Sequence, residues 1–184
     1  MIALPRGGVP VAHEVAQALG APLDIALVRK LGAPSRPELG IGALGEDGTA
    51  VLDGETIAAL GVTRAQIETV VAHEADELER RRRLYRGDTT PVDVDQRTVV
   101  LVDDGIATGV TAIAATRMLV TRGAIRVVTA VPVCPAVAVH RLRDRLGELV
   151  YLESPRHFGG VGAWYDDFTQ TSDAEVVELL SGGR

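Results

Sequence analysis

Residues 99–111 constrain the fold more than any other part of this sequence. Four consecutive apolar residues, 99–102, are followed at once by Asp103 and Asp104 and then by a run of small residues that leads into a helical pattern. An apolar run without alternation predicts a central strand that is covered on both faces. Because ligands bind at the carboxyl ends of parallel strands in α/β sheets, the pattern predicts a binding site that contains both acids.

The run after the two acids has the composition of an anion-binding loop. Glycine and alanine let backbone N–H groups approach a ligand closely, and the start of the next helix adds partial positive charge. The hydroxyls of Thr108 and Thr111 can donate hydrogen bonds to the same ligand. A phosphate suits this loop, whereas Asp103 and Asp104 suit ribose hydroxyls or a Mg²⁺ ion held through water. The residues therefore predict a sugar phosphate ligand, with a tight turn and solvated acids as the alternative.

Short segments rich in valine, isoleucine and leucine alternate with longer helical patterns along the chain. This alternation is typical of βαβ units and predicts an α/β fold with a mostly parallel sheet flanked by helices. Strands are expected at residues 2–4, 23–28, 99–102, 126–133 and 149–152. Helices are expected at residues 10–19, 63–85, 110–121 and 136–145, and from Ser172 onward. The polar linker at 87–96 is too short to divide two domains, so a single domain is predicted over residues 1–184.

Two segments between the second strand and the long helix carry turn signals. Pro34, Ser35 and Pro37 interrupt any periodicity, so residues 31–40 are predicted to be irregular. Residues 41–44 and 50–52 flank a Gly-Glu-Asp-Gly turn and predict a hairpin.

Composition and charge exclude several classes of protein. Lysine and arginine number 19 and aspartate and glutamate 25, so the net charge of −6 disfavours binding to nucleic acid or to an anionic membrane. The single cysteine, Cys134, excludes an intrachain disulfide and a cysteine-based metal site. No apolar run approaches the roughly 20 residues of a membrane span, and no signal peptide is visible, so a soluble cytoplasmic protein is expected.

A run of four arginines, residues 80–83, is the one basic cluster of the long helix. Acidic side chains stand four positions before three of these arginines, and i, i+4 pairs of opposite charge stabilise a solvated helix face. The acids are Asp76, Glu77 and Glu79. We therefore interpret the run as a paired surface and not as a nucleic-acid site.

Taken in order, four segments resemble the type I phosphoribosyltransferases, closest to a bacterial group of predicted phosphoribosyltransferases. Residues 103–109 resemble the loop that binds phosphoribosyl pyrophosphate (PRPP) in that family. Residues 4–8 resemble the short pyrophosphate loop after the first strand, which has an unusual backbone geometry, and residues 28–30 resemble the basic strand end before the mobile catalytic loop. Residues 153–171 lie where the family places a variable hood over the base. The resemblance implies a Rossmann-like core with a small C-terminal hood.

The resemblance also implies an activity and a set of site residues. A Mg²⁺-dependent enzyme would transfer the ribose 5-phosphate of PRPP to a nitrogenous base and release pyrophosphate. Asp103 and Asp104 would bind the ribose hydroxyls with Mg²⁺ held through water, and they would form the catalytic set with Arg29 and Lys30. The 5′-phosphate would be bound by Gly105, Ile106, Ala107, Thr108, Gly109 and Thr111. The pyrophosphate would be bound by Arg6, Gly7, Gly8, Arg29 and Lys30, whose charges suit a departing anion.

The hood and the lid complete the expected site. Aromatic residues are 3% of the chain, yet five of the six lie in the last 34 positions: Tyr151, Phe158, Trp164, Tyr165 and Phe168. Such a cluster suits stacking against a base, with Phe158, Trp164 and Tyr165 as the expected contacts. A small hydrophobic core of the hood is the alternative. Residues 31–40 would be the mobile lid that excludes water, with an ordinary surface loop as the alternative.

Two departures from the family pattern limit the resemblance. Ala107 occupies the position of an acid that assists at the purine ring in the 6-oxopurine branch, which disfavours that mechanism. The chain also opens at its first strand, where relatives carry a preceding helix, so a shortened N-terminus is expected. Two alternatives therefore stay open: a catalytically silent protein that senses PRPP or nucleotides, and a hydrolase of phosphorylated sugars. The sequence also leaves the acceptor open, while the helix at 63–85 offers surface for a homodimer.

Overall fold

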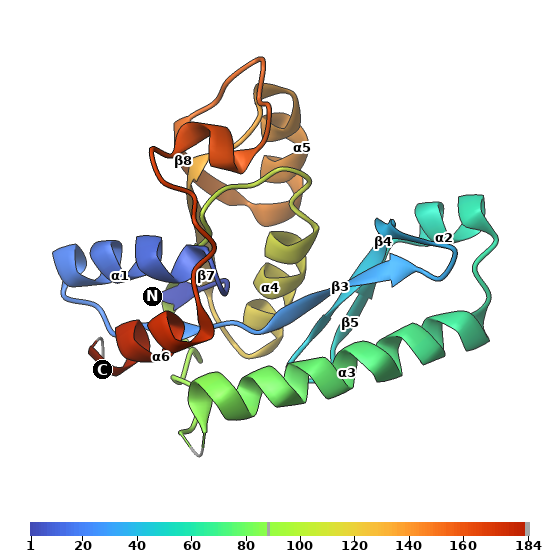
Figure 1. The fold of residues 1–184 in the computed structure, drawn as a ribbon, viewed down its shortest axis with the longest axis horizontal. Helices are drawn as coiled ribbons and strands as arrows, with labels where there is room; N and C mark the ends of the chain where they lie inside the picture. The colour runs from blue at the N-terminus through green and yellow to red at the C-terminus, as the bar shows by residue number, and fades with distance from the viewer. Residues whose placement is uncertain (88, 183–184) are drawn as a thin grey trace.

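A computed structural model of the chain describes residues 1–87 and 89–182. Its main sheet has five parallel strands in the order β2-β1-β6-β7-β8 (Figure 1). The strands are β1 (Ile2–Ala3), β2 (Asp24–Ile25), β6 (Thr98–Val102), β7 (Arg126–Val133) and β8 (Glu148–Glu153). The predicted α/β fold with a mostly parallel sheet is therefore confirmed. Asp88 of the predicted linker, and Gly183 and Arg184 of the predicted domain, lie outside the described residues.

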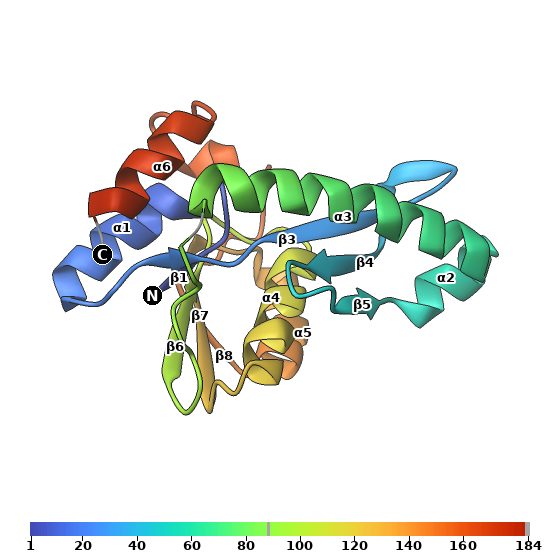
Figure 2. The same cartoon turned by 90° about the horizontal axis from the view of Figure 1, so that it is seen from below.

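Helices cover both faces of this sheet, as the uninterrupted apolar strands require. The helices of the described residues are α1 (Gly8–Leu19), α2 (Gly54–Leu60), α3 (Arg64–Arg86), α4 (Val110–Thr121), α5 (Ala136–Leu146), the short 3₁₀ helix η1 (Val161–Trp164) and α6 (Asp173–Gly182), of which α2 and η1 do not cover this sheet. One hydrophobic cluster joins α4 and α5 to β6 and β7, and a second joins α1, α6 and the end of α3 to β1 and β2. Figure 2 shows α1 and α6 on one side of the strands and α4 and α5 on the other. Among the described residues, no helix has both the length and the apolar character needed to cross a membrane.

A second, antiparallel sheet forms an arm beside the main sheet. It consists of β3 (Val28–Ala33), β4 (Arg36–Gly45) and β5 (Ala50–Leu52), and α3 lies along it (Figures 1 and 2). The pairing of β4 with β5 confirms the predicted hairpin. The prediction that residues 31–40 are irregular is wrong, because β3 and β4 pair through this region.

A bulge explains why the prolines did not prevent strand formation. Gly32 pairs with Gly40 and the next residue, Ala33, pairs with Arg36, so residues 37–39 bulge out of the ladder. Proline is tolerated in a bulge, since no ladder hydrogen bond from its nitrogen is needed there. The backbones approach so closely that a Cβ on Gly32 would lie 2.5 Å from the Pro37 carbonyl oxygen.

Helix α3 shows the start and the charge pairing that the sequence predicts. Thr63 and Gln66 form a reciprocal capping box at its first turn. Each acid of the run binds two arginines: Glu77 accepts from Arg80 and Arg81, and Glu79 accepts from Arg82 and Arg83. These bonds lower the pKa of both glutamates to about 2. The paired surface is confirmed, with Glu77 in place of Asp76 as the partner of Arg80.

Candidate functional site

Asp103 and Asp104 directly follow β6 at the carboxyl edge of the main sheet. The Asp104 backbone N–H donates to Asp103 Oδ1 over 3.0 Å, which fixes the orientation of the Asp103 carboxylate. Among the described residues, neither carboxylate forms an ion pair with a basic side chain. Burial raises the pKa of both groups, and repulsion from Asp104 raises the pKa of Asp103 further. The two carboxyls therefore repel each other when both are ionised, and no basic side chain of the described residues offsets that repulsion.

These raised pKa values give a stability prediction with a definite sign. At pH values between the ordinary aspartate pKa of 3.8 and the raised pKa of the folded state, the folded chain binds more protons than the unfolded chain. The contribution of this pair to the free energy of unfolding therefore falls as the pH rises through this range. Asp103→Asn removes one buried charge and its repulsion. We expect the variant to melt above the wild type at pH 7, and the difference to shrink as the pH falls toward 3.8. Thermal unfolding between pH 4 and pH 8 measures it, and a difference that grows toward low pH would contradict the assignment.

The turn between β1 and α1 packs directly against the two acids. Its Pro5–Arg6 peptide bond is cis, the unusual backbone geometry that the resemblance implies for this loop. A Cβ on Gly7 would collide with Oδ2 of Asp104. A Cβ on Gly8 would lie 2.8 Å from the Val102 carbonyl oxygen and 2.9 Å from the Asp103 Cα. Glycine at both positions is therefore what allows the turn to lie against the end of β6.

Gly8→Ala is expected to destabilise the fold by about 1–3 kcal/mol, because the new methyl group meets backbone that can move only with the sheet. Gly54→Ala is the matched control. Like Gly8 it is the first residue of a helix, but a Cβ there meets nothing within 4 Å. Urea unfolding of both variants measures the difference. Equal stability of the two variants would show that Gly8 does not lie against the end of β6.

A cradle of about 210 Å³ lies on one side of the acids, at the start of α4. It is lined by Asp103, residues 105–112 and Val161. Gly109 adopts a left-handed conformation (φ 80°) immediately before α4, and the buried Ile106 anchors the loop to β7 through a 3.0 Å hydrogen bond from its N–H to the Val133 carbonyl. All six residues predicted to bind the 5′-phosphate lie here. The Ile106 side chain points into the core and its N–H is bonded to Val133, so Ile106 anchors the loop and has no donor left for an anion.

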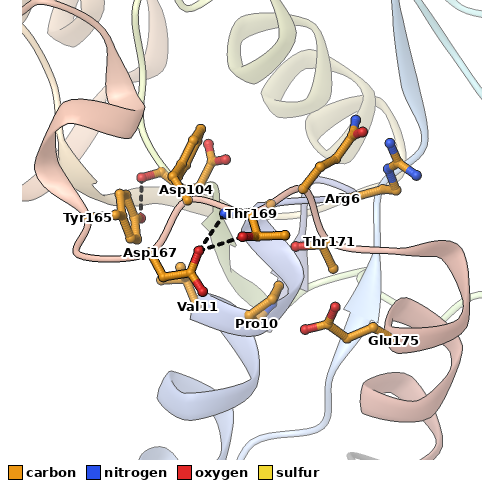
Figure 3. Close-up of a pocket in the computed structure, with 12 residues that line it drawn as sticks. Arg6, Pro10, Val11, Asp104, Tyr165, Asp167, Thr169, Thr171 and Glu175 are labelled. Atoms are coloured by element: carbon orange, nitrogen blue, oxygen red, sulfur yellow. Dashed lines mark hydrogen bonds between the residues drawn. The ribbon is translucent and has the colours of Figure 1, made fainter.

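A larger cavity of about 730 Å³ lies on the other side of the acids (Figure 3). Its walls are the β1–α1 turn, the first turn of α1 and the C-terminal segment before and at the start of α6. The lining residues are Arg6, Gly7, Pro10, Val11, Asp104, Tyr165, Asp167, Phe168, Thr169, Gln170, Thr171 and Glu175. Asp103 thus lines the smaller space and Asp104 the larger, so the acidic pair separates the two.

The hood aromatics divide between the cavity and the surface. The Tyr165 hydroxyl donates to the Asp104 carbonyl oxygen, and its ring lies 5.2 Å from that of Phe168. Burial and the two nearby acids raise the pKa of Tyr165 to about 12. Trp164 instead donates from Nε1 to the Phe158 carbonyl. Neither Trp164 nor Phe158 lines the cradle or the large cavity. Of the three expected base contacts, the structure therefore brings Tyr165 to the acids, together with Phe168.

The predicted cations are not all brought together. The Arg6 guanidinium lies at the large cavity, whereas Arg29 donates from Nε to Glu74 of α3 over 2.7 Å. Lys30 donates from Nζ to the Glu38 carbonyl oxygen over 2.9 Å, along the arm. Neither Arg29 nor Lys30 lines the two cavities. Their assignment to pyrophosphate stays a prediction.

The sequence did not single out most residues of one wall of the large cavity. Residues 167–171 and Glu175 form this wall; residues 167–171 belong to the predicted hood, but only Phe168 among them was named, as one of the clustered aromatics. For Glu175 the local indication was the helix start at Ser172, whose hydroxyl accepts from the Glu175 N–H. That start orients α6 but does not indicate which loop the helix approaches.

Known proteins resemble this chain in sequence and in fold. A sequence model of the phosphoribosyl transferase domain matches residues 1–161. Two proteins of Mycobacterium tuberculosis, named "Putative phosphoribosyl transferase Rv0571c" and "Putative phosphoribosyl transferase MT0597", are each 46% identical over 180 residues, which is 98% of this chain. The chain spans 41% of the length of these curated relatives. The crystal structure of the protein TT1426 from Thermus thermophilus is 43% identical, with a TM-score of 0.82 over 99% of this chain and 86% of that one.

Proposed function

Because the chain belongs to the phosphoribosyl transferase family, we propose that it transfers the ribose 5-phosphate of PRPP to a nitrogenous base and releases pyrophosphate. The observation that carries the proposal is the position of Asp103 and Asp104 between two cavities. PRPP has a phosphate at one end, a pyrophosphate at the other and ribose hydroxyls between them. This order matches the cradle at α4, the acidic pair, and the large cavity that contains Arg6.

The chemistry assigns a separate task to each part of the site. The bond from the anomeric carbon to the pyrophosphate oxygen breaks, pyrophosphate leaves with the electron pair, and a base nitrogen forms the new bond to carbon. Positive charge develops on the ribose ring, close to the carboxylates of Asp103 and Asp104 that bind its hydroxyls. Arg6 stabilises the departing anion, and the N–H groups of residues 107–109 hold the phosphate.

The acidic pair also fits a Mg²⁺ ion that is shared with the substrate. Mg²⁺ commonly binds one or two carboxylates together with substrate phosphates and waters. Asp103 and Asp104 supply two adjacent carboxylates with raised pKa values and no basic partner among the described residues. Within the same part of the chain, no three histidine, cysteine, aspartate or glutamate side chains form a metal site by themselves. Bound there, Mg²⁺ would supply positive charge to the pyrophosphate.

Titration calorimetry with PRPP and Mg²⁺, followed by an assay of pyrophosphate release with a panel of bases, tests the proposal. We expect binding of PRPP and base-dependent release of pyrophosphate. Failure to bind PRPP at millimolar concentration would overturn the proposal. Release of pyrophosphate without any base would instead indicate hydrolysis of the activated sugar by the same cleft.

A catalytically silent sensor of PRPP or nucleotides is the second candidate. The contacts of Arg29 and Lys30 favour it, since Arg29 binds Glu74 of α3 and Lys30 binds the Glu38 carbonyl of the arm. These contacts leave Arg6 as the basic side chain at the large cavity. Ala107 also provides no acid to assist at a base. Binding of PRPP without pyrophosphate release on every base tested would favour this sensor over the enzyme.

A further inference from the structure

Arg6 is held by a carboxylate that lies far from it in the sequence. Its Nη1 lies 3.4 Å from Oδ1 of Asp173, the first residue of α6. The hydroxyl of Tyr85, near the end of α3, donates to the same oxygen over 2.5 Å. One carboxylate oxygen thus connects the β1–α1 turn with two helices.

The charges of this group are well defined at neutral pH. The bond from Tyr85, followed by the nearby arginines Arg6, Arg80 and Arg81, lowers the pKa of Asp173, so its carboxylate stays ionised. Burial and the bond to Asp173 raise the pKa of Tyr85 to about 12, so the phenol keeps its proton and stays a donor. Asp173 is therefore a fixed negative charge whose orientation is set by α3.

The contact with Asp173 restrains the Arg6 guanidinium but leaves most of its N–H donors for a ligand. Among the described residues, Asp173 engages one of its five N–H donors, at 3.4 Å, and the others can meet an anion in the large cavity. The two side chains are 26% and 38% exposed, and ion pairs exposed to this degree contribute little to stability. A role in orienting Arg6 explains this arrangement better than a role in holding the fold.

We propose that Asp173 is a positioning residue for the pyrophosphate of PRPP, that it acts through Arg6, and that Tyr85 fixes its carboxylate. This inference rests on the proposed function. Asp173 lies outside the residues matched by the family's sequence model, which ends at residue 161. The assignment comes from the packing of α6 against α1 and α3, which brings Asp173 to Arg6 in this structure.

Asp173→Asn tests the inference because it removes the charge but keeps an oxygen that Tyr85 can reach. In titration calorimetry of the full chain with Mg²⁺, we expect PRPP to bind about threefold to tenfold more weakly. Binding of ribose 5-phosphate should not change, because that ligand has no pyrophosphate. Glu178→Gln, a matched loss of a carboxylate on an exposed position of α6, should leave the affinity for both ligands unchanged.

A double-mutant cycle shows whether Asp173 acts through Arg6. If it does, Arg6→Ala combined with Asp173→Asn binds PRPP no more weakly than Arg6→Ala alone. Tyr85→Phe should weaken PRPP binding in the same selective way but less. Additive effects, or equal losses for PRPP and ribose 5-phosphate, would overturn the inference in favour of a structural role for α6. If the wild type binds PRPP and Asp173→Asn binds it equally well, only this inference fails, whereas a wild type that binds no PRPP overturns both proposals.

Discussion

Replacing both site acids, Asp103→Asn with Asp104→Asn, is expected to reduce PRPP binding and pyrophosphate release by at least about 100-fold, since groups that stabilise developing charge commonly contribute 10²–10³ in rate. The substitution keeps the shape of both side chains but removes the charges that face the ribose ring. The fold should survive, because the two charges are destabilised by burial and have no basic partner among the described residues. Titration calorimetry and a pyrophosphate assay measure the loss, and thermal unfolding checks the fold.

A charge-matched control separates this local effect from a change in net charge. Asp76→Asn with Asp144→Asn removes two carboxylates from exposed positions on α3 and α5. That variant should bind PRPP as the wild type does. Wild-type binding and turnover by the Asp103 and Asp104 double variant would remove both acids from the site and overturn the proposed function.

Arg86→Leu is expected to destabilise the protein by about 3–5 kcal/mol, the usual cost of leaving buried charges without their partner. The Arg86 side chain is 1% exposed and contacts Asp24 and Glu46, which are 6% and 9% exposed. Arg86 also donates to the Ile25 carbonyl over 2.8 Å, so it ties the end of α3 to β2. Urea unfolding at neutral pH measures the loss of stability.

Arg64, which also lies on α3, provides the control for Arg86→Leu. Arg64 pairs with Glu68 at 92% exposure, so Arg64→Leu should cost less than about 1 kcal/mol. Burial already raises the pKa of Glu46, against the opposing effect of Arg86. Loss of Arg86 should raise that pKa further, so the Arg86→Leu variant should recover part of its stability as the pH is lowered and Glu46 becomes protonated. Equal unfolding midpoints for the two variants would contradict the buried network.

The sequence was informative where one segment contains the whole pattern. The four apolar residues before Asp103 identified β6, and the position of the acids after that strand located the candidate site. The expected start of the long helix at residue 63 is confirmed by the capping box of Thr63 and Gln66, a motif that depends only on residues three positions apart. The alternation of strands and helices was sufficient to predict the α/β fold.

The sequence was uninformative where a structure depends on partners that are distant along the chain. Residues 31–40 were predicted to be irregular because of their prolines. In the structure, β3 pairs with β4 through this region and a bulge accommodates Pro37, so these residues belong to a sheet. Arg29 was expected to face a ligand, but its partner, Glu74, lies 45 residues away on α3. Nothing near either residue in the sequence indicates that they meet.

By itself, the sequence determined the fold class, the central strand with its two acids and the small-residue loop that follows, because the apolar pattern of a strand and the composition of a loop are set by residues a few positions apart. Only the tertiary structure decided which cation lines the large cavity and which segments form its walls. Arg6, Tyr85 and Asp173 meet because β1, α3 and α6 pack against one core, although up to 167 residues separate them. Such contacts follow from how all the elements fill the interior together, and no local pattern records that arrangement.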